Sequence, residues 1–508
     1  MKTLAEILLR SNDEGSSRPA LVEPHRAVTY AELSERCFAL ALHLQEAGLE
    51  PGGTAGLLLP NGADFVTAYF AVLSAGGIVV PLNADYRVQE IRRFIRSCRL
   101  RLLVASRSHQ ALCEEVAALD RSEDLQCSFV FIEDWAFQED RPRLSAARLP
   151  VAVSPEQPAM FQFSSGSTGL PKRIARTHAQ LLWELEQLRT TLRFNPDDRF
   201  LGAAPFSHVN GLVRTMLSSL YARAALYPVP SFERRTVASL IEEHRLTTFI
   251  AVPFMFCMLA ETRFSRPPDF SSLRWCISAS APMPVHLNQE FRRRYGRYVR
   301  QLYGSTETGT ISVNLDPDPA ESLASVGHPL PGFRVEVLAD HGGPQGTLAE
   351  GEIAVAGPGA ITGYEDLPEV NRESFRDGFF LTGDVGKKDA AGRIYLLGRK
   401  KFFINKGGYK INPQEIEDLL HHHPCVREAA VIGVPTAYED EKVKAVIVPS
   451  AQVSPEDLVE FCRGRIADFK IPSLFEFREE LPRSPTGKLR KKLLLEQDGN
   501  GHAAGGES

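Results

Sequence analysis

The chain has 508 residues, of which 43% are hydrophobic and 24% are charged, a composition that excludes a disordered or fibrous protein. At roughly 100–200 residues per domain, this length predicts two to four domains. The net charge of −5 leaves no basic excess for a nucleic-acid surface. We therefore expect small anionic ligands, bound locally, and no nucleic-acid partner.

Eight cysteines are scattered along the chain without a Cys-x-x-Cys pair. This pattern fits neither a disulfide framework nor a zinc site, and it favours a reducing compartment. The N-terminal apolar run is too short for a signal peptide, and no run approaches the roughly 18 residues of a membrane span. These features predict a cytoplasmic protein without a membrane span.

From Ala27 to Val104 the sequence alternates helical and strand patterns. Thr29 and Glu32 have the spacing of a capping box, which predicts an amphipathic helix from there through Leu49. Alternation of helices with short apolar runs is typical of a parallel, doubly wound sheet. The predicted strands are 54–59, 78–82 and 102–105, and the further helices are 63–75 and 89–98.

A hydroxyl- and glycine-rich loop, Ser164–Lys172, follows an apolar run and precedes a helix-like run at 177–185. Glycine permits the dihedral angles with which such a loop directs backbone N–H groups, hydroxyls and one ammonium at a single anion. The pattern therefore predicts a phosphate site between a strand and a helix. A flexible Ser/Gly linker is the alternative, but a linker need not end in Pro171-Lys172.

Strand and helix patterns continue from Leu201 to Thr308, and each apolar run there ends in a loop of small or polar residues. Ligands of open α/β sheets bind at the carboxyl ends of strands, so we expect several of these loops to converge on one site. Short strands with Gly and Pro turns between 327 and 397 predict a small, barrel-like antiparallel sheet.

The predicted fold is therefore α/β. Residues 1–398 form a large N-terminal domain of two doubly wound subdomains plus the barrel-like sheet, 399–401 a hinge, 402–495 a smaller α+β domain, and 496–508 a disordered tail. The run His421–His423 resembles a metal site, but consecutive residues face different sides of a helix, which favours a helix end.

Six motifs, in this order, resemble those of the acyl-adenylate-forming superfamily, which includes acyl- and aryl-CoA synthetases, firefly luciferase and the adenylation domains of peptide synthetases. The overall run is most similar to coumarate:CoA ligases and related synthetases. The motifs are Ser164–Lys172, Phe206–Gly211, Tyr303–Glu307, Thr382–Asp384, Gly398-Arg399 and Pro482–Lys488.

The resemblance implies two half-reactions. A carboxylate attacks the α-phosphate of ATP and releases pyrophosphate, and the acyl-adenylate then passes its acyl group to CoA. The first step brings two anions together, so it needs concentrated positive charge, which Mg²⁺ and lysine supply. The domain after the hinge residue Lys401 would be a mobile lid, and Gly407 and Gly408 would line the thiol entry.

The resemblance also assigns roles to single residues. Lys488 would bridge carboxylate and phosphate oxygens, Thr306 would contact the α-phosphate, and Glu307 would help to hold Mg²⁺. His208 completes the predicted catalytic set, and Asp384 would accept the ribose hydroxyls. The predicted nucleotide-binding residues are Ser164, Ser165, Gly166, Ser167, Thr168, Gly169, Lys172, Ser280, Ala281, Tyr303, Thr306, Asp384, Arg399 and Lys488.

Each of these residues also has an ordinary structural interpretation when it is taken alone. Lys488 would be a surface lysine, Asp384 a turn former, and His208 a buried histidine with its hydrogen bonds satisfied. Only their occurrence together, in the order of the family, favours the functional roles.

The predicted acid pocket is apolar with few charges, and Gly309 would leave room for a ring. No carboxylate stands where amino-acid-activating relatives carry an aspartate, so we expect an aryl or medium-chain carboxylic acid rather than a free α-amino acid. The predicted pocket residues are His208, Val209, Val213, Phe254 and Gly309.

The acceptor stays open among CoA, a free-standing carrier protein and an amine, and CoA is favoured because the Gly407-Gly408 turn is present. An inactive relative that only binds nucleotide is a further alternative. The retention of the charged and hydroxyl residues of the motifs argues against it: Lys172, Thr306, Glu307, Asp384 and Lys488.

Overall fold

The computed structural model describes residues 1–9, 16–120, 127–136, 150–164, 172–339, 343–406, 409–435, 441–483, 489–491 and 493–495. The chain divides into two compact units. Unit 1 comprises Met1–Leu323, Pro329–Arg334 and Ala356–Phe380, and unit 2 comprises the remaining segments. The strands between 327 and 397 are thus shared between the units, and the hinge predicted at 399–401 stays a prediction. The predicted tail lies outside the described residues.

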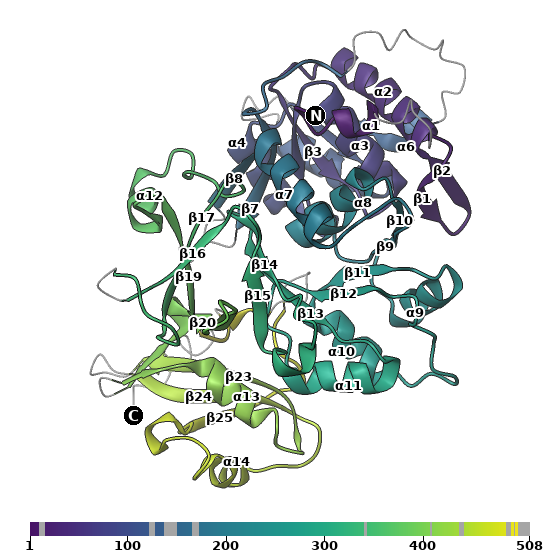
Figure 1. Ribbon diagram of the computed structural model, residues 1–508. Helices are drawn as coiled ribbons and strands as arrows, with labels where there is room; N and C mark the ends of the chain where they lie inside the picture. Colours follow the sequence, from purple (N-terminus) through teal and green to yellow (C-terminus); the bar gives the residue numbers. More distant parts are fainter. Residues whose placement is uncertain are drawn as a thin grey trace. The chain divides into compact units, whose positions relative to one another are not determined.

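The first sheet of unit 1 consists of β3 (Thr54–Leu58), β4 (Ile78–Pro81), β5 (Leu102–Ala105), β6 (Ser128–Phe131), β7 (Pro158–Ser164) and β8 (Lys172–Thr177). Its strand order is β6-β5-β3-β4-β7-β8, and every pair is parallel except β7–β8. Figure 1 labels β3, β7 and β8 of this sheet. The parallel α/β organisation predicted for this region is confirmed. Burial of β3, β4 and β5 on both faces explains their continuous apolar sequences.

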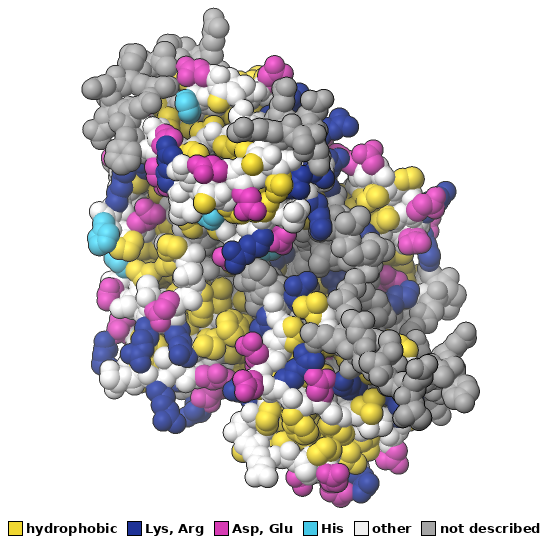
Figure 2. Space-filling view, turned by 180° about the vertical axis from the view of Figure 1, so that it is seen from behind, with side chains coloured by type: hydrophobic (Ala, Val, Ile, Leu, Met, Phe, Trp, Pro, Cys, Tyr) yellow, Lys and Arg dark blue, Asp and Glu magenta, His cyan; other side chains and the backbone are white. Residues whose placement is uncertain are grey.

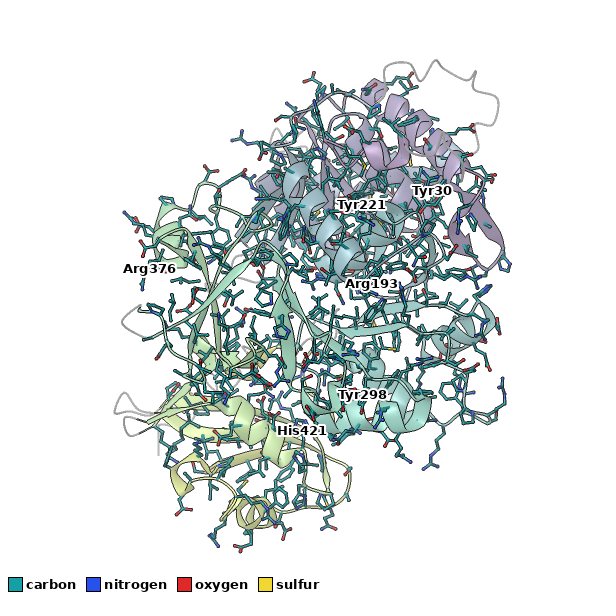
Figure 3. The ribbon with its side chains drawn as sticks, in the orientation of Figure 1. Tyr30, Arg193, Tyr221, Tyr298, Arg376 and His421 are labelled. Atoms are coloured by element: carbon teal, nitrogen blue, oxygen red, sulfur yellow. The ribbon has the colours of Figure 1, made fainter. Side chains whose placement is uncertain are left out.

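Helix α2 (Tyr30–Glu46) begins where the capping box predicts. The Thr29 hydroxyl accepts a hydrogen bond from the Glu32 backbone, and the Glu32 carboxylate accepts one from Thr29 N at 2.7 Å. The Tyr30 hydroxyl donates to Ala224 O at 2.9 Å, so α2 is fixed to the region of the second sheet (Figure 3). The other helices here are α1 (Glu6–Leu9), α3 (Ala63–Ser74), α4 (Val88–Cys98), α5 (Gln110–Asp120), α6 (Ile132–Ala136) and α7 (His178–Thr191).

The second sheet of unit 1 runs β2-β1-β10-β9-β11-β12-β13-β14. It is parallel from β1 to β13 and antiparallel at both ends. A core of side chains such as Leu201, Phe249 and Phe291 fills one side of it. The strands are β1 (Pro19–Glu23), β2 (Arg26–Thr29), β9 (Arg199–Gly202), β10 (Ala225–Pro228), β11 (Thr248–Ala251), β12 (Trp275–Ser278), β13 (Arg300–Ser305) and β14 (Gly309–Val313).

A π-helix, η4 (Asn210–Leu217), follows the β9 loop, and α8 (Ser218–Tyr221) continues it. The remaining helices of unit 1 are α9 (Arg234–Glu243), α10 (Pro253–Glu261), α11 (Val285–Tyr295) and α12 (Pro368–Ser374), and β18 (Phe375–Arg376) is a short strand. Within the described ranges, no helix is both long and apolar enough to cross a membrane.

Unit 2 contains an antiparallel sheet in the order β16-β17-β19-β20-β15, as the short strands and turns predict. A second, three-stranded sheet, β23-β24-β25, packs with α13 (Pro413–Leu420) and α14 (Pro455–Cys462) around an apolar core. The strands are β15 (Ser325–Pro329), β16 (Arg334–Leu338), β17 (Gly351–Ala356), β19 (Phe379–Lys388), β20 (Ile394–Arg399), β21 (Ile404–Lys406), β22 (Tyr409–Ile411), β23 (Val426–Pro435), β24 (Glu441–Pro449) and β25 (Leu474–Phe477).

The histidine run lies at a helix end, as predicted. Helix α13 ends at Leu420, and the His421 ring bonds the Glu417 carbonyl at 2.6 Å (Figure 3). No group of three or more His, Cys, Asp or Glu side chains in the described part of the chain is placed to hold a metal. Figure 2 shows basic and acidic side chains interspersed over the face that it presents.

Candidate functional site

The order of the second sheet defines a switch point between β9 and β11. The chain leaves β9 towards β10 on one side and returns to β11 on the other. Ligands of open α/β sheets bind outside the carboxyl ends of strands at such a point. His208 and Val209 follow β9 and Phe254 follows β11, so three residues of the predicted acid pocket lie at this edge.

Asn61, which lies between β3 and α3, holds the loop after β9. It follows β3 of the first sheet and is buried, and its Nδ2 donates to Ala204 O at 2.9 Å. Its Oδ1 accepts from Phe206 N at 2.8 Å. One side chain therefore satisfies a carbonyl and an amide of the loop that leads to His208. An Asn-Gly pair is typical of turns, so the sequence gives no signal for this contact.

Burial lowers the pKa of His208 to about 4. The imidazole is therefore neutral at pH 7 and offers one donor and one acceptor rather than a positive charge. The residue lies two positions before η4, and its carbonyl accepts a hydrogen bond from Leu212 N of that helix at 2.8 Å. A neutral ring is suited to orienting a substrate group and not to balancing its charge.

Glu307 follows the carboxyl end of β13 and is buried. Tyr364 donates to its Oε1 at 3.0 Å, and the Nζ of Lys172 lies 4.9 Å from the centre of the same tyrosine ring. Thus Lys172, at the start of β8, and the predicted magnesium ligand share one aromatic neighbour. Tyr364 was not among the predicted residues, because a lone tyrosine in a turn-rich stretch carries no motif.

A buried ion pair supports the backbone of the same loop. Arg176 and Glu184 are 3.0 Å apart and neither side chain is exposed to solvent. Arg176 also donates to Thr306 O at 3.2 Å, and Glu184 accepts from both N and Oγ1 of Thr310 at 2.8 Å. The pair therefore fixes the segment on both sides of Glu307.

The surroundings of Gly309 differ from the expectation that it leaves room for a ring. Its φ is +68°, which favours glycine, and a Cβ there would run into the Glu184 carboxylate and come within 3.0 Å of Arg176. That side of Gly309 is filled by charged groups, so it holds no space for a substrate ring.

The other predicted residues of unit 1 lie in or after the strands of the second sheet and in η4. Ser280 and Ala281 are exposed after β12, and Ser280 has φ +74°, an uncommon value for a residue with a side chain that is typical of functional turns. Tyr303 is buried in β13. Val209 and Val213 are buried, whereas Phe254 is 38% exposed.

Asp384 and Arg399 are paired in unit 2. They lie opposite each other on β19 and β20, and their side chains form an ion pair at 2.6 Å. Arg399 also donates to Thr382 O at 3.0 Å, and the Thr382 hydroxyl accepts from Asp384 N at 3.1 Å. The arrangement holds a carboxylate and a guanidinium side by side, as contacts to ribose hydroxyls and phosphate would require.

Several predicted residues lie outside the described part of the structure. These are Ser165–Pro171, Gly407, Gly408 and Lys488, and the side chains of Ser164 and Lys401. Their roles stay predictions. The ends of the glycine-rich loop are described, and Ser164 pairs with Lys172 across β7 and β8. The loop therefore joins two antiparallel strands, and the expectation that it leads to a helix missed β8.

Two protein-family models match successive parts of the chain. A model of the AMP-binding enzyme family matches residues 8–365, and a model of the AMP-binding enzyme C-terminal domain matches residues 415–488. A long-chain-fatty-acid CoA ligase of Bacillus subtilis is 30% identical, over 99% of this chain and 95% of that one. A feruloyl-CoA synthase of Amycolatopsis is 33% identical, over 93% and 96%.

Solved structures resemble the chain over its full length. ATP-bound MatB from Rhodopseudomonas palustris has a TM-score of 0.89 at 29% identity, covering 97% of this chain and 98% of that one. The amide bond synthetase McbA from Marinactinospora thermotolerans has a TM-score of 0.85 at 28% identity, covering 97% and 99%.

Proposed function

The chain belongs to the AMP-binding enzyme family and is an AMP-forming acyl-CoA synthetase, and from this premise we propose that it activates an aryl or medium-chain carboxylic acid and transfers the acyl group to CoA. ATP-dependent ligation of an acid to CoA is the activity of its relatives. The nature of the acid, the use of Mg²⁺ and the residue roles are proposals. They rest on the chemistry of the side chains described above.

The observation that carries the proposal is the Lys172–Tyr364–Glu307 arrangement. A lysine from one sheet and a buried carboxylate from the other meet at one tyrosine, beside the ends of the glycine-rich loop. A hard divalent cation prefers carboxylate and phosphate oxygens, so Glu307 fits Mg²⁺ and Lys172 fits a phosphate. When bound, the ion would neutralise phosphate charge as the carboxylate approaches.

In the proposed first half-reaction, a carboxylate oxygen of the acid bonds to the α-phosphorus of ATP and pyrophosphate leaves. Thr306, Lys172 and Lys488 would hold the phosphate and carboxylate oxygens, and Asp384 would hold the ribose. In the second half-reaction, the thiol sulfur bonds to the acyl carbon, the thiol proton is released and AMP leaves. The neutral His208 ring would orient the acyl group by a hydrogen bond.

The acid class is proposed from the buried valines of η4 and its preceding loop. Val209 and Val213 are apolar and buried, which suits a hydrocarbon or aromatic portion. No carboxylate is present between His208 and Val213 to pair with an amino group. One relative is named a feruloyl-CoA synthase and another a long-chain-fatty-acid CoA ligase. These names therefore do not define the size of the acid that this protein prefers.

An amine is the second candidate acceptor, because a structure of similar TM-score is an amide bond synthetase. A free-standing carrier protein is the third. All three acceptors use the same acyl-adenylate, so the first half-reaction does not distinguish them. A nucleotide-binding protein without catalysis would instead fail to exchange pyrophosphate in the presence of any acid.

The decisive experiment identifies products by mass spectrometry from the enzyme, MgATP and a panel of aryl and aliphatic acids, each with and without CoA. We expect acyl-CoA and AMP from aryl or C6–C10 acids. Acyl-AMP that persists when CoA is present would overturn the CoA acceptor and favour an amine or a carrier protein. Reaction only with acetate or with very long fatty acids would overturn the acid class.

A further inference from the structure

The π-helix η4 carries an arginine that the proposed reaction does not use. Arg214 follows Val213 directly and is 2% exposed. Its Nε donates to the Thr310 hydroxyl at 3.1 Å, and its Nη2 lies 2.6 Å from where a Cβ of Gly304 would stand. The guanidinium therefore lies against the two backbone segments that flank Thr306 and Glu307.

The charge around Arg214 is unbalanced. Among the described residues, the charged groups that act on it are Glu184 and Arg176; with Arg214 itself they make two cations and one anion, all buried. One carboxylate oxygen of Glu184 accepts hydrogen bonds from Thr310, and the other accepts one from Arg176. Burial lowers the pKa of Arg214 to about 10, with Glu184 opposing and Arg176 adding to this effect, so the group is still a cation at pH 7.

Polar atoms at this place also lack partners. Within the ranges that the structure describes, the Nη2 of Arg214 makes no hydrogen bond, and neither do the Oδ1 and Nδ2 of Asn210. Asn210 is 5% exposed and stands about one turn before Arg214 on the same helix. Buried polar groups in native proteins are nearly always paired, so the unpaired Nη2 of Arg214 and the unpaired amide of Asn210 require a ligand or water.

We propose that Arg214, with Asn210 beside it, binds a second anionic group on the acid, so that the preferred substrate is a dicarboxylic or sulfonated carboxylic acid. The proposal rests on the proposed function and specifies its substrate class. The Nη2 that lacks a partner donates to a carboxylate oxygen, while Nε stays bonded to Thr310, and the carboxylate offsets the excess buried positive charge. The amide of Asn210 donates a further hydrogen bond, and the buried valines hold the carbon skeleton between the two acid groups.

The first test uses the unmodified enzyme and acids that differ only in the second group. The pairs are benzoate with terephthalate and hexanoate with adipate, with 4-sulfobenzoate and 4-hydroxybenzoate added. We expect kcat/KM for the dianionic acid of each pair to be at least tenfold higher than kcat/KM for its monoacid partner. Equal or higher values for the monoacids would overturn this inference while leaving the proposed function intact, and 4-hydroxybenzoate matching terephthalate would overturn the need for charge. Inactivity with every acid would overturn the proposed function itself.

The second test replaces the guanidinium. In Arg214→Leu, the kcat/KM ratio of diacid to monoacid is expected to fall about 30-fold or more, mainly through the KM of the diacid, which is the scale of removing one buried partner of a charge pair. Arg214→Lys keeps the charge and is expected to keep part of the preference. Arg235→Leu, on the exposed side of α9, is the matched control and leaves the ratio unchanged.

A purely structural arginine would behave differently. Loss of activity by the same factor with both acids, accompanied by a lower melting temperature and an unchanged ratio, would overturn the inference. The variant Asn210→Ala should have a smaller effect than Arg214→Leu. We expect its kcat/KM ratio of diacid to monoacid to fall by roughly threefold to tenfold, the scale of one neutral hydrogen bond. An Asn210→Ala ratio equal to that of the unmodified enzyme would remove Asn210 from the proposed site.

Discussion

The Tyr364 hydroxyl donates a hydrogen bond of 3.0 Å to the Glu307 carboxylate. Its ring faces the ammonium of Lys172 at 4.9 Å, so the tyrosine contacts a cation with its face and an anion with its edge. This single side chain orients two groups that the proposed reaction needs at the phosphates of ATP.

Tyr364→Phe keeps the ring and removes only the hydrogen bond. Because Glu307 would then lose a donor that fixes its carboxylate, we expect the KM for MgATP to rise roughly fivefold, the scale of one hydrogen bond of about 1 kcal/mol. Steady-state kinetics with varied MgATP measure this. The control is Tyr298→Phe, whose ring packs under Arg292 (Figure 3). An unchanged KM in Tyr364→Phe would exclude the positioning role.

Glu184→Gln tests the buried ion pair. The amide leaves Arg176 and Arg214 without a buried anion, so we expect unfolding free energy to fall by about 3 kcal/mol, the scale of breaking a buried pair. Glu186→Gln, on the same helix, breaks the partly exposed pair with Arg189 and should cost less than about 1 kcal/mol. Thermal unfolding followed by circular dichroism compares the two. Equal melting temperatures would contradict the prediction.

His178 should make stability depend on pH. It is buried at the first position of α7, Leu4 N donates to its Nδ1 at 3.2 Å, and burial lowers its pKa to about 4. The unfolded chain, with a pKa near 6.5, binds the proton more tightly, so protonation favours unfolding. The resulting loss of unfolding free energy is absent above about pH 7, grows as the pH falls below 6.5, and reaches about 3 kcal/mol near pH 4.

The variant His178→Asn retains an acceptor for Leu4 N and removes the titration. Between pH 7 and pH 4.5, we expect its melting temperature to fall less steeply than that of the unmodified protein. The exposed His25→Asn is the control and should follow the unmodified protein. Parallel curves for all three proteins would show that His178 does not contribute. His208 has a lowered pKa as well, so a residual slope is expected in every variant.

Lys488→Ala should slow adenylation by roughly 10²-fold or more while leaving nucleotide binding largely intact, the typical cost of losing one preorganised charge at a reacting oxygen. Acid-dependent pyrophosphate exchange measures the rate, and equilibrium dialysis measures ATP binding. Lys442→Ala removes an exposed lysine of β24 for comparison. An unchanged exchange rate would show that the role transferred to Lys488 by resemblance is wrong.

Much of the fold could be predicted because local signals and burial agree. The strand at Leu102–Ala105 and the capping box at Thr29 occur where the sequence places them. Strand β8 could not be predicted, because its inward-facing Arg176 is a charge that becomes tolerable only when the next helix folds back and places Glu184 against it. A strand whose inward-facing residue is charged does not show the alternation of apolar and polar residues by which strands are predicted.

The residues of the candidate site also differ in whether the sequence predicts them. Glu307 and Asp384 belong to contiguous motifs, so resemblance is sufficient to propose roles for them. Asn61, Tyr364 and Arg214 act through contacts between segments far apart in the chain, and no local pattern encodes those contacts. Arg214 is a single charged residue in a helix that is otherwise buried and mostly apolar, and it was not among the predicted pocket residues.

The contacts of Asn61 bear on how this protein can be recombined with others. The loop that carries His208 belongs to the second sheet, yet its carbonyl and amide are held by a side chain of the first. Exchanging one α/β subdomain for that of another protein would therefore alter acid selection unless an asparagine is retained at the end of the incoming strand. The contacts that hold the proposed acid-binding loop cross the boundary between the two sheets, so a graft designed from chain connectivity alone would break them.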